Sequence, residues 1–248
     1  MNHRSDHDFY IGYQPEAPPR LASAVRWQVG ALLAPALLAV LLAAWNQESP
    51  APSVYEYGTS LTLRGRLHEH PFPHLVTVDG AGVRTWLLGA EYKHGADGLV
   101  AGLDGQEVEF TASRIHRGEH GMLELHQPAR AITGHTPHLQ PEVMGPRTIT
   151  GEIVDSKCWM GAMNPGEGPT HRLCALRCLR GGLPPMITGV DAEGQPVAAL
   201  LTGPGGVRMD SVLWSFTAAR VRVTGPVRRI GTLLLLETDP ASIERVDR

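Results

Sequence analysis

The sequence predicts a mainly β protein, in which two small barrels follow one transmembrane α-helix. Residues 27–45 form an uncharged apolar run with a tryptophan at each end. The rest of the chain has short alternating apolar runs between turns rich in its 28 Gly and 20 Pro, a pattern typical of strands. That pattern occurs twice. The net charge of −3 argues against a nucleic-acid partner, and three cysteines are too few for a disulfide scaffold.

The N-terminal region is expected to be a tail, residues 1–26, and a membrane anchor, residues 27–45. About 20 apolar residues cross a bilayer as a helix; Trp27 and Trp45 suit its two interfaces, and Pro35 is tolerated inside. The positive-inside rule leaves the tail in the cytoplasm, because three arginines precede the run and the next basic residue is far beyond it: Arg4, Arg20, Arg26 and then Arg64. A cleaved signal peptide is the alternative, although residues 42–44 make a poor cleavage site.

Three aromatic residues of the tail, Phe9, Tyr10 and Tyr13, are candidates for docking on the cytoplasmic face of a partner. The alternative is that they have no specific role.

A β module is repeated in the remaining chain. Residues 62–67 match 148–153, and later strands match at 83–89 and 196–203, 107–111 and 220–224, and 122–126 and 233–237. Short helices are expected at 99–103 and 212–218. This order is typical of the OB fold, a five-stranded, partly open barrel. We therefore expect tandem OB-like domains at 58–135 and 148–246, with linkers at 46–57 and 136–147; a single β-sandwich would not explain the repeat.

The second copy has an insertion between its first and second strands, at about residues 156–182. The matched glycines Gly65 and Gly151 are 86 apart and the matched strands 107 and 220 are 113 apart, so 27 residues are added. All three cysteines lie there: Cys158, Cys174 and Cys178. A helix is expected at 171–180, with Thr170 as its N-cap and Gly181 or Gly182 ending it.

Three roles for these cysteines stay open. In the first, Cys158 forms a disulfide with Cys174 or Cys178. In the second, one thiol is redox-active, namely Cys174 near the start of the helix. In the third, the three thiolates bind zinc or copper. The tentative additional metal ligands are His171, Met160 and Met163. His171 and Cys178 would be about 10.5 Å apart along a helix, so both bind one ion only if His171 lies off the regular helix.

The second module resembles a family of bacterial envelope domains. The resemblance rests on the run from Gly151 to Cys158 (GEIVDSKC), on Cys174 and Cys178 in C-x3-C spacing before a glycine pair, and on the later Val-Thr-Gly at 223–225. It covers residues 148–246 and implies an OB-like domain outside the cytoplasm. It implies no catalytic residue. With the charge pattern, it indicates an inner-membrane protein with periplasmic domains.

His68, His70 and His74 form a weaker second metal candidate, in the first module at the position of the cysteine insertion. Solvent-facing polar residues are the alternative. No nucleophile elbow, P-loop or dinucleotide motif occurs, so we expect no enzyme. The sequence favours a non-catalytic accessory subunit that docks on or helps to assemble a membrane complex, such as a respiratory one, with no cofactor required. The alternative is a periplasmic metal-binding or thiol-redox protein.

Overall fold

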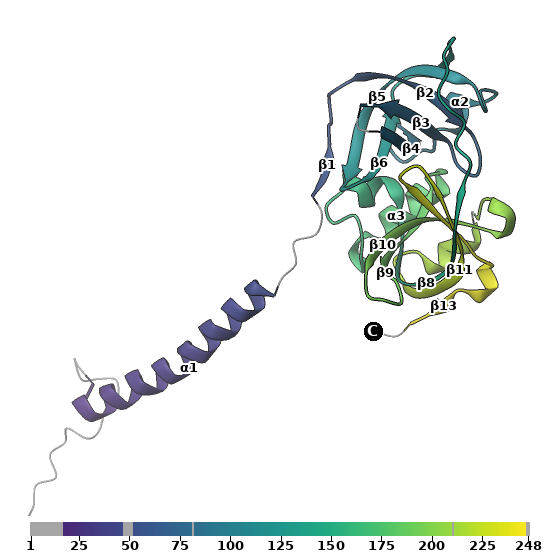
Figure 1. The fold of residues 1–248 in the computed structure, drawn as a ribbon. Helices are drawn as coiled ribbons and strands as arrows, with labels where there is room; N and C mark the ends of the chain where they lie inside the picture. The colour runs from purple at the N-terminus through teal and green to yellow at the C-terminus, as the bar shows by residue number, and fades with distance from the viewer. Residues whose placement is uncertain (1–16, 47–51, 81, 210, 247–248) are drawn as a thin grey trace, which may run out of the picture. The chain divides into compact units, whose positions relative to one another are not determined.

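The computed structural model describes residues 17–46, 52–80, 82–209 and 211–246 (Figure 1). It divides into two compact units, residues 1–50 and 51–248. In the first unit, helix α1 (Pro19–Trp45) contains the whole predicted span, with Pro35 inside it and no buried residue. It is long and apolar enough to cross a membrane, so it suits a membrane anchor or a signal sequence. The predicted N-terminal apolar helix is therefore confirmed.

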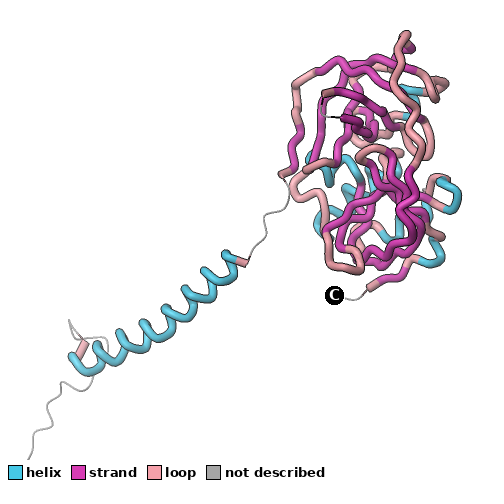
Figure 2. Tube along the Cα trace, viewed as in Figure 1, coloured by secondary structure: helices cyan, strands magenta, loops and turns pink. Residues whose placement is uncertain are grey.

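The second unit is mainly β, as predicted, and its helices are short (Figure 2). Its first half closes into a five-stranded barrel through antiparallel pairs and one parallel pair, β4 with β6. The barrel strands are β2 (Leu61–His68), β3 (His74–Asp79), β4 (Gly82–Ala90), β5 (Glu107–Arg117) and β6 (His120–Leu125). The short strands β1 (Ser53–Tyr55) and β7 (Arg130–Ala131) pair with β5, and α2 (Asp97–Val100) precedes it.

The second half repeats this arrangement as a ring of hydrogen-bonded strands, in which β10 and β12 form the parallel pair. Its strands are β8 (Glu142–Asp155), β9 (Pro185–Val190), β10 (Pro196–Thr202), β11 (Arg220–Ile230) and β12 (Leu233–Glu237). The short strand β13 (Glu244–Arg245) pairs with β11. The matched sequence segments thus fall on corresponding strands of the two rings.

One glycine in each ring explains the first sequence match. Gly65 in β2 and Gly151 in β8 lie where the neighbouring strand crosses closely. A Cβ would stand 2.3 Å from the Val76 carbonyl oxygen at Gly65, and 1.9 Å from that of Thr188 at Gly151. Only a residue without a side chain fits there, so both rings need glycine where the first strand bends.

The two rings pack against each other through a shared core. Each has a core of its own, around Phe110 in the first and Ile187 in the second. A third cluster joins Phe72, Leu87 and Met122 of the first half to Trp159 and other buried residues of the second. The insertion between β8 and β9 supplies much of this third cluster, and its helix α3 (Arg172–Arg180) lies between the two sheets (Figure 1).

Candidate metal centre

The cysteine insertion folds as three short helical segments. A wide π turn (Cys158–Ala162) follows β8, a 3₁₀ turn (Pro169–His171) comes next, and α3 then runs to Arg180. Thr170 does not cap α3: the helix begins after His171 without a side-chain cap. His171 therefore lies just outside the regular helix, which is the condition that lets its ring approach the thiols.

The insertion brings the three thiols together. The Sγ atoms of Cys158 and Cys178 are 3.7 Å apart. Donor atoms of Cys158, His171 and Cys174 lie within 4.8 Å of one another, and so do those of Asp155, Cys158 and Cys178. Cys158 belongs to both sets. Because such separations are close to those between ligands of one bound ion, this cluster can bind a metal.

Asp155 organises the buried side of the cluster. Its side chain is fully buried; one carboxylate oxygen accepts a hydrogen bond from the backbone N–H of Cys158 at 2.9 Å. The other lies 3.2 Å from Nε2 of His171. A carboxylate beside a histidine fixes the orientation of the ring, an arrangement common around metal-ligating histidines. Asp155 thus positions Cys158 and His171, besides offering an oxygen ligand.

The three thiols are free in the structure. The hydrogen bond of Cys158 with Cys178, together with burial, raises the pKa of the Cys158 thiol well above the usual thiol range. Binding of a metal must then release a proton from this thiol. The disulfide hypothesis needs Cys158 to pair with Cys174 or Cys178, and the Sγ atom of Cys178 lies 3.7 Å from that of Cys158. The disulfide itself stays a prediction.

Lys93 brings a positive charge to the cluster from the first half of the unit. Its Nζ donates a hydrogen bond to Cys174 Sγ at 2.7 Å and lies 3.8 Å from Cys178 Sγ. The hydrogen bond to Cys174 raises the pKa of Lys93, so the ammonium stays charged. Two glycines allow this approach. Gly95 N–H donates to the Gly181 carbonyl at 2.8 Å, and a Cβ on Gly181 would stand 1.8 Å from the Lys93 carbonyl oxygen.

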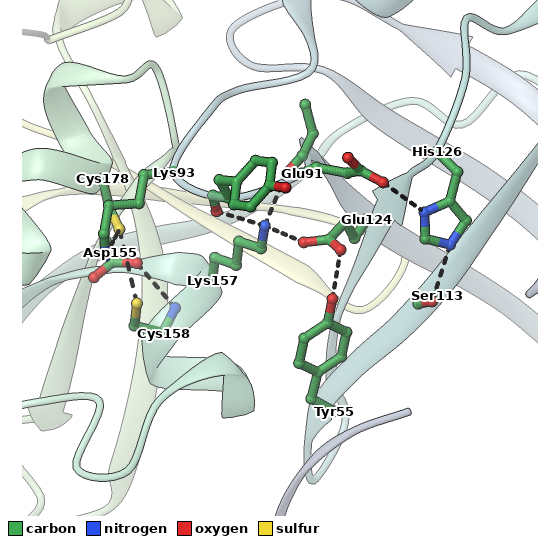
Figure 3. A network of polar contacts seen from close by, with 12 residues as sticks. Tyr55, Glu91, Lys93, Ser113, Glu124, His126, Asp155, Lys157, Cys158 and Cys178 are labelled. Atoms are coloured by element: carbon green, nitrogen blue, oxygen red, sulfur yellow. Dashed lines mark hydrogen bonds and ion pairs between the residues drawn. The ribbon is translucent and has the colours of Figure 1, made fainter. Parts of the chain in front are cut away.

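A buried ion pair fastens the insertion to the first barrel (Figure 3). Lys157 is paired with Glu124 of β6 and also donates to the carbonyl oxygens of Ala90 and Tyr92, at 2.7 Å each. Glu124 accepts a further hydrogen bond from the Tyr55 hydroxyl. Burial and this contact raise the pKa of Tyr55, which keeps the phenol protonated as a donor. The ammonium is thereby fully satisfied, which buried charges require.

A cavity of about 510 Å³ leads to the thiols, lined by residues of both halves. Cys158 and Cys178 form part of its wall, and Met163 lies on it. Met160, by contrast, is buried in the shared core. Of the tentative extra ligands, His171 therefore joins the thiol cluster, Met163 faces the cavity and Met160 packs against apolar neighbours.

The histidines of the first module are arranged differently. The rings of His68 and His74 stack with centroids 5.1 Å apart and planes 19° apart, and His138 tilts against His68. Lone pairs of stacked rings run side by side and do not converge on one point. Within the described ranges, both groups of three or more potential ligands lie at the cysteine site, and neither contains His68, His70 or His74.

The remaining predicted residues lie outside the barrel unit. Trp27, Pro35 and Trp45 all lie on α1. Phe9, Tyr10 and Tyr13 lie outside the described residues.

Four residues of the site were not predicted from the sequence: Lys93, Glu124, Asp155 and Lys157. The two lysines are the only ones in the chain, among 22 basic residues. A lysine directly before a cysteine, inside an insertion, was an available signal for Lys157. Lys93 and Glu124 gave none, because each is distant in sequence from the cysteines.

Comparison of the chain with protein-family models, with curated proteins and with solved structures finds no match.

Proposed function

We propose that this chain is a membrane-anchored protein that binds a soft metal ion, Cu⁺ or Zn²⁺, at the cysteine cluster. One observation carries the proposal. Cys158 Sγ belongs to two sets of potential ligand atoms in a largely buried site, and within each set all atoms lie within 4.8 Å of one another. Thiolates with an imidazole suit Zn²⁺, and thiolates alone suit Cu⁺.

Charge balance supports this proposal. Three thiolates around Cu⁺ or Zn²⁺ leave a net negative charge, and burying that charge unpaired is costly. Lys93 supplies the opposite charge at 2.7 Å from Cys174 Sγ. Asp155, hydrogen-bonded toward Cys158 and His171, supplies the outer contact that orients ligands.

The surrounding architecture supports two OB-like domains as the frame of the site. In both rings the first strand pairs with the second and fourth, and the third runs parallel to the fifth. That is the strand order of the OB fold. The site lies where the two frames meet, so we propose that the frames hold the metal centre and carry out no reaction themselves.

We also propose that α1 is an uncleaved anchor, with the metal centre on the periplasmic side of a bacterial inner membrane. The apolar side chains of α1 are exposed within their unit, which a bilayer would cover. The arginines before the run, Arg4, Arg20 and Arg26, favour a cytoplasmic N-terminus. Labelling of a single introduced cysteine from either side of the membrane, in a background with the native cysteines replaced, tests this orientation.

Metal analysis of the full chain, purified in mild detergent under reducing and oxygen-free conditions, tests the metal proposal. We expect about one zinc or copper per chain. Because Cys158 belongs to both ligand sets, Cys158→Ser should reduce the metal content at least about tenfold, and Cys174→Ser should reduce it less. The exposed His135 provides the control, since His135→Ala should leave it unchanged.

Thiol titration on a second preparation, purified without reductant and also assayed for metal, separates the alternatives. One reactive thiol per unfolded chain and no metal would overturn the proposal and support a Cys158–Cys178 disulfide, for which the 3.7 Å separation is favourable. Three reactive thiols with no metal would equally overturn it and leave a thiol-redox role.

A second candidate function is that of a non-catalytic accessory subunit of a membrane complex. The observation that favours it is α1, which has no buried residue and so presents its whole apolar surface. Such a surface suits helix packing with other subunits within the bilayer. Purification in mild detergent tests this role: defined partner proteins should co-purify with the wild type but not with a variant whose span is replaced by polyleucine. A chain that always purifies alone would overturn it.

A further inference from the structure

The cavity beside the thiols is larger than a metal ion requires. Its volume is about 510 Å³, whereas one water molecule occupies about 30 Å³ of liquid. Pockets for small organic molecules typically measure about 300–1,000 Å³. The size of this cavity therefore fits an organic molecule next to the metal.

The position of the cavity leaves the centre open on one side. The wall includes Cys158 and Cys178, two potential ligands of one set, while Asp155 of that set is fully buried away from solvent. An ion held between these residues would have protein on one side and the cavity on the other. Structural metal sites are closed by four protein ligands, whereas reactive and exchanging sites keep one position open. The set of Asp155, Cys158 and Cys178 supplies three protein ligands, which leaves one position of a four-coordinate ion for the cavity side.

The cavity wall carries two glutamates and two lysines, Glu91, Glu124, Lys93 and Lys157, and of these Lys93 lies at the thiols. Lys157 is fully engaged with Glu124 and two carbonyl oxygens. Lys93 is different: its ammonium has three donors and lies 2.7 Å and 3.8 Å from the sulfurs of Cys174 and Cys178. A further sulfur anion on the metal, on the cavity side, would lie near the same ammonium.

The outer part of the cavity suits a small organic body with a polar end. Three tyrosines line it, Tyr55, Tyr57 and Tyr92, of which the last two are largely exposed. The far wall carries hydrogen-bonding groups, with Ser113 Oγ 3.0 Å from His126 Nε2 (Figure 3). Aromatic walls with a few polar groups are the usual composition of small-molecule sites.

We propose that the metal at the cysteine cluster keeps one coordination position open toward this cavity and binds a low-molecular-weight thiol there. The thiol gives its S–H proton to solvent, and its sulfur forms a bond to the metal by displacing the solvent ligand; nothing is oxidised or reduced. Lys93, whose ammonium lies beside the sulfurs of Cys174 and Cys178, gives the added sulfur a charge-assisted contact. The proposal rests on the metal-binding function above and names the exchange partner of that same site.

Calorimetric titration of the metal-loaded full chain with thioglycolate tests the inference, and glycolate serves as the control without sulfur. Metal content is measured on the same sample before and after. We expect saturable binding of about one thioglycolate per metal, no binding of glycolate and retention of the metal. Because removal of the ammonium loses a charge-assisted contact, Lys93→Met should weaken thioglycolate binding about tenfold. Arg222→Met, at an exposed position of β11, should have no effect.

Blocking the cavity gives a second, independent measurement. Met163 is exposed and lies on the cavity, so Met163→Trp should abolish thioglycolate binding while the metal stays bound. Leu173→Trp is the matched control, because Leu173 is exposed on α3 of the same insertion and does not line the cavity. A metal-loaded protein that binds no thioglycolate, or that loses its metal to it, would overturn the inference while leaving metal binding intact. A protein that never holds metal would overturn the proposed function itself.

Discussion

The two rings of this protein share their strand order but differ in one connection. Between β2 and β3 the chain passes through residues 69–73, a short loop with two prolines. Between β8 and β9 it passes through residues 156–184, which carry α3 and every cysteine. The short loop leaves the first barrel with a buried histidine at its end, His74, and the long one packs against that barrel. One insertion therefore supplies much of the contact between the halves and the chemistry at it.

The largest expected effect concerns the ion pair that fastens the insertion to the first barrel. Lys157→Met leaves Glu124 buried without its charge partner, which should lower the free energy of unfolding by about 3–5 kcal/mol. The double variant Lys157→Met, Glu124→Met removes both charges and should lose less than the single variant. Urea unfolding monitored by circular dichroism measures both. A double variant as unstable as the sum of the two single ones would show that the pair is not coupled.

Truncation of a side chain in the shared core tests whether the two halves unfold together. Phe72 of the first half is buried, and Cζ of the Arg208 guanidinium lies 4.3 Å from the centroid of the Phe72 ring. Phe72→Ala should cost about 3–5 kcal/mol and lower one calorimetric transition of the whole unit. If calorimetry of the variant showed a second peak at the transition temperature of the wild type, the second ring would unfold independently of the first.

Acidification should destabilise the first barrel, with the largest contribution from His74, because burial also lowers the pKa values of His68 and His120. Burial lowers the pKa of His74 to about 4, against its usual 6.5, despite the 2.9 Å contact of Nδ1 with the Phe72 carbonyl. The unfolded chain thus binds the proton more tightly than the folded one. The stabilisation is complete above pH 6.5 and falls by about 3 kcal/mol as pH drops toward 4. His68, stacked on His74, also contributes to lowering its pKa, and Asp104 opposes it.

Urea unfolding at pH 7 and pH 4.5 measures this dependence. His74→Leu should flatten the difference between the two pH values, whereas His135→Leu, at an exposed position, should keep it. An unchanged pH dependence in His74→Leu would mean that other groups cause it.

The smallest effect is expected at an exposed ion pair of the second ring. Arg229 Nη2 lies 2.6 Å from Glu142 Oε2, but both side chains are about half exposed. Arg229→Met should change the free energy of unfolding by less than about 1 kcal/mol, because solvent and salt screen the pair. A loss of unfolding free energy as large as that of Lys157→Met would contradict this prediction. It would show that the difference in burial does not explain the different contributions of the two ion pairs.

Much of the architecture follows from local patterns. The apolar run with no charge predicted α1, and the alternating runs between glycine-rich turns predicted a mainly β protein. The cysteines at i and i+4 predicted one face of a helix, because 3.6 residues per turn fix that relation. The helix cap was wrong: Thr170 lies in a 3₁₀ turn, and α3 begins at Arg172. Local propensity does not decide where a short turn gives way to a helix.

The candidate site was predictable only in part. The sequence itself determined that the cysteines share one insertion and that His171 needs to leave the helix in order to join them. Only the tertiary structure decided that Lys93 reaches Cys174, that Glu124 neutralises Lys157 and that a cavity opens between the halves. The physical reason is range. Periodicity and spacing act over a few residues, whereas the Glu124–Lys157 and Lys93–Cys174 contacts join residues 33 and 81 positions apart, through the packing of one barrel on the other.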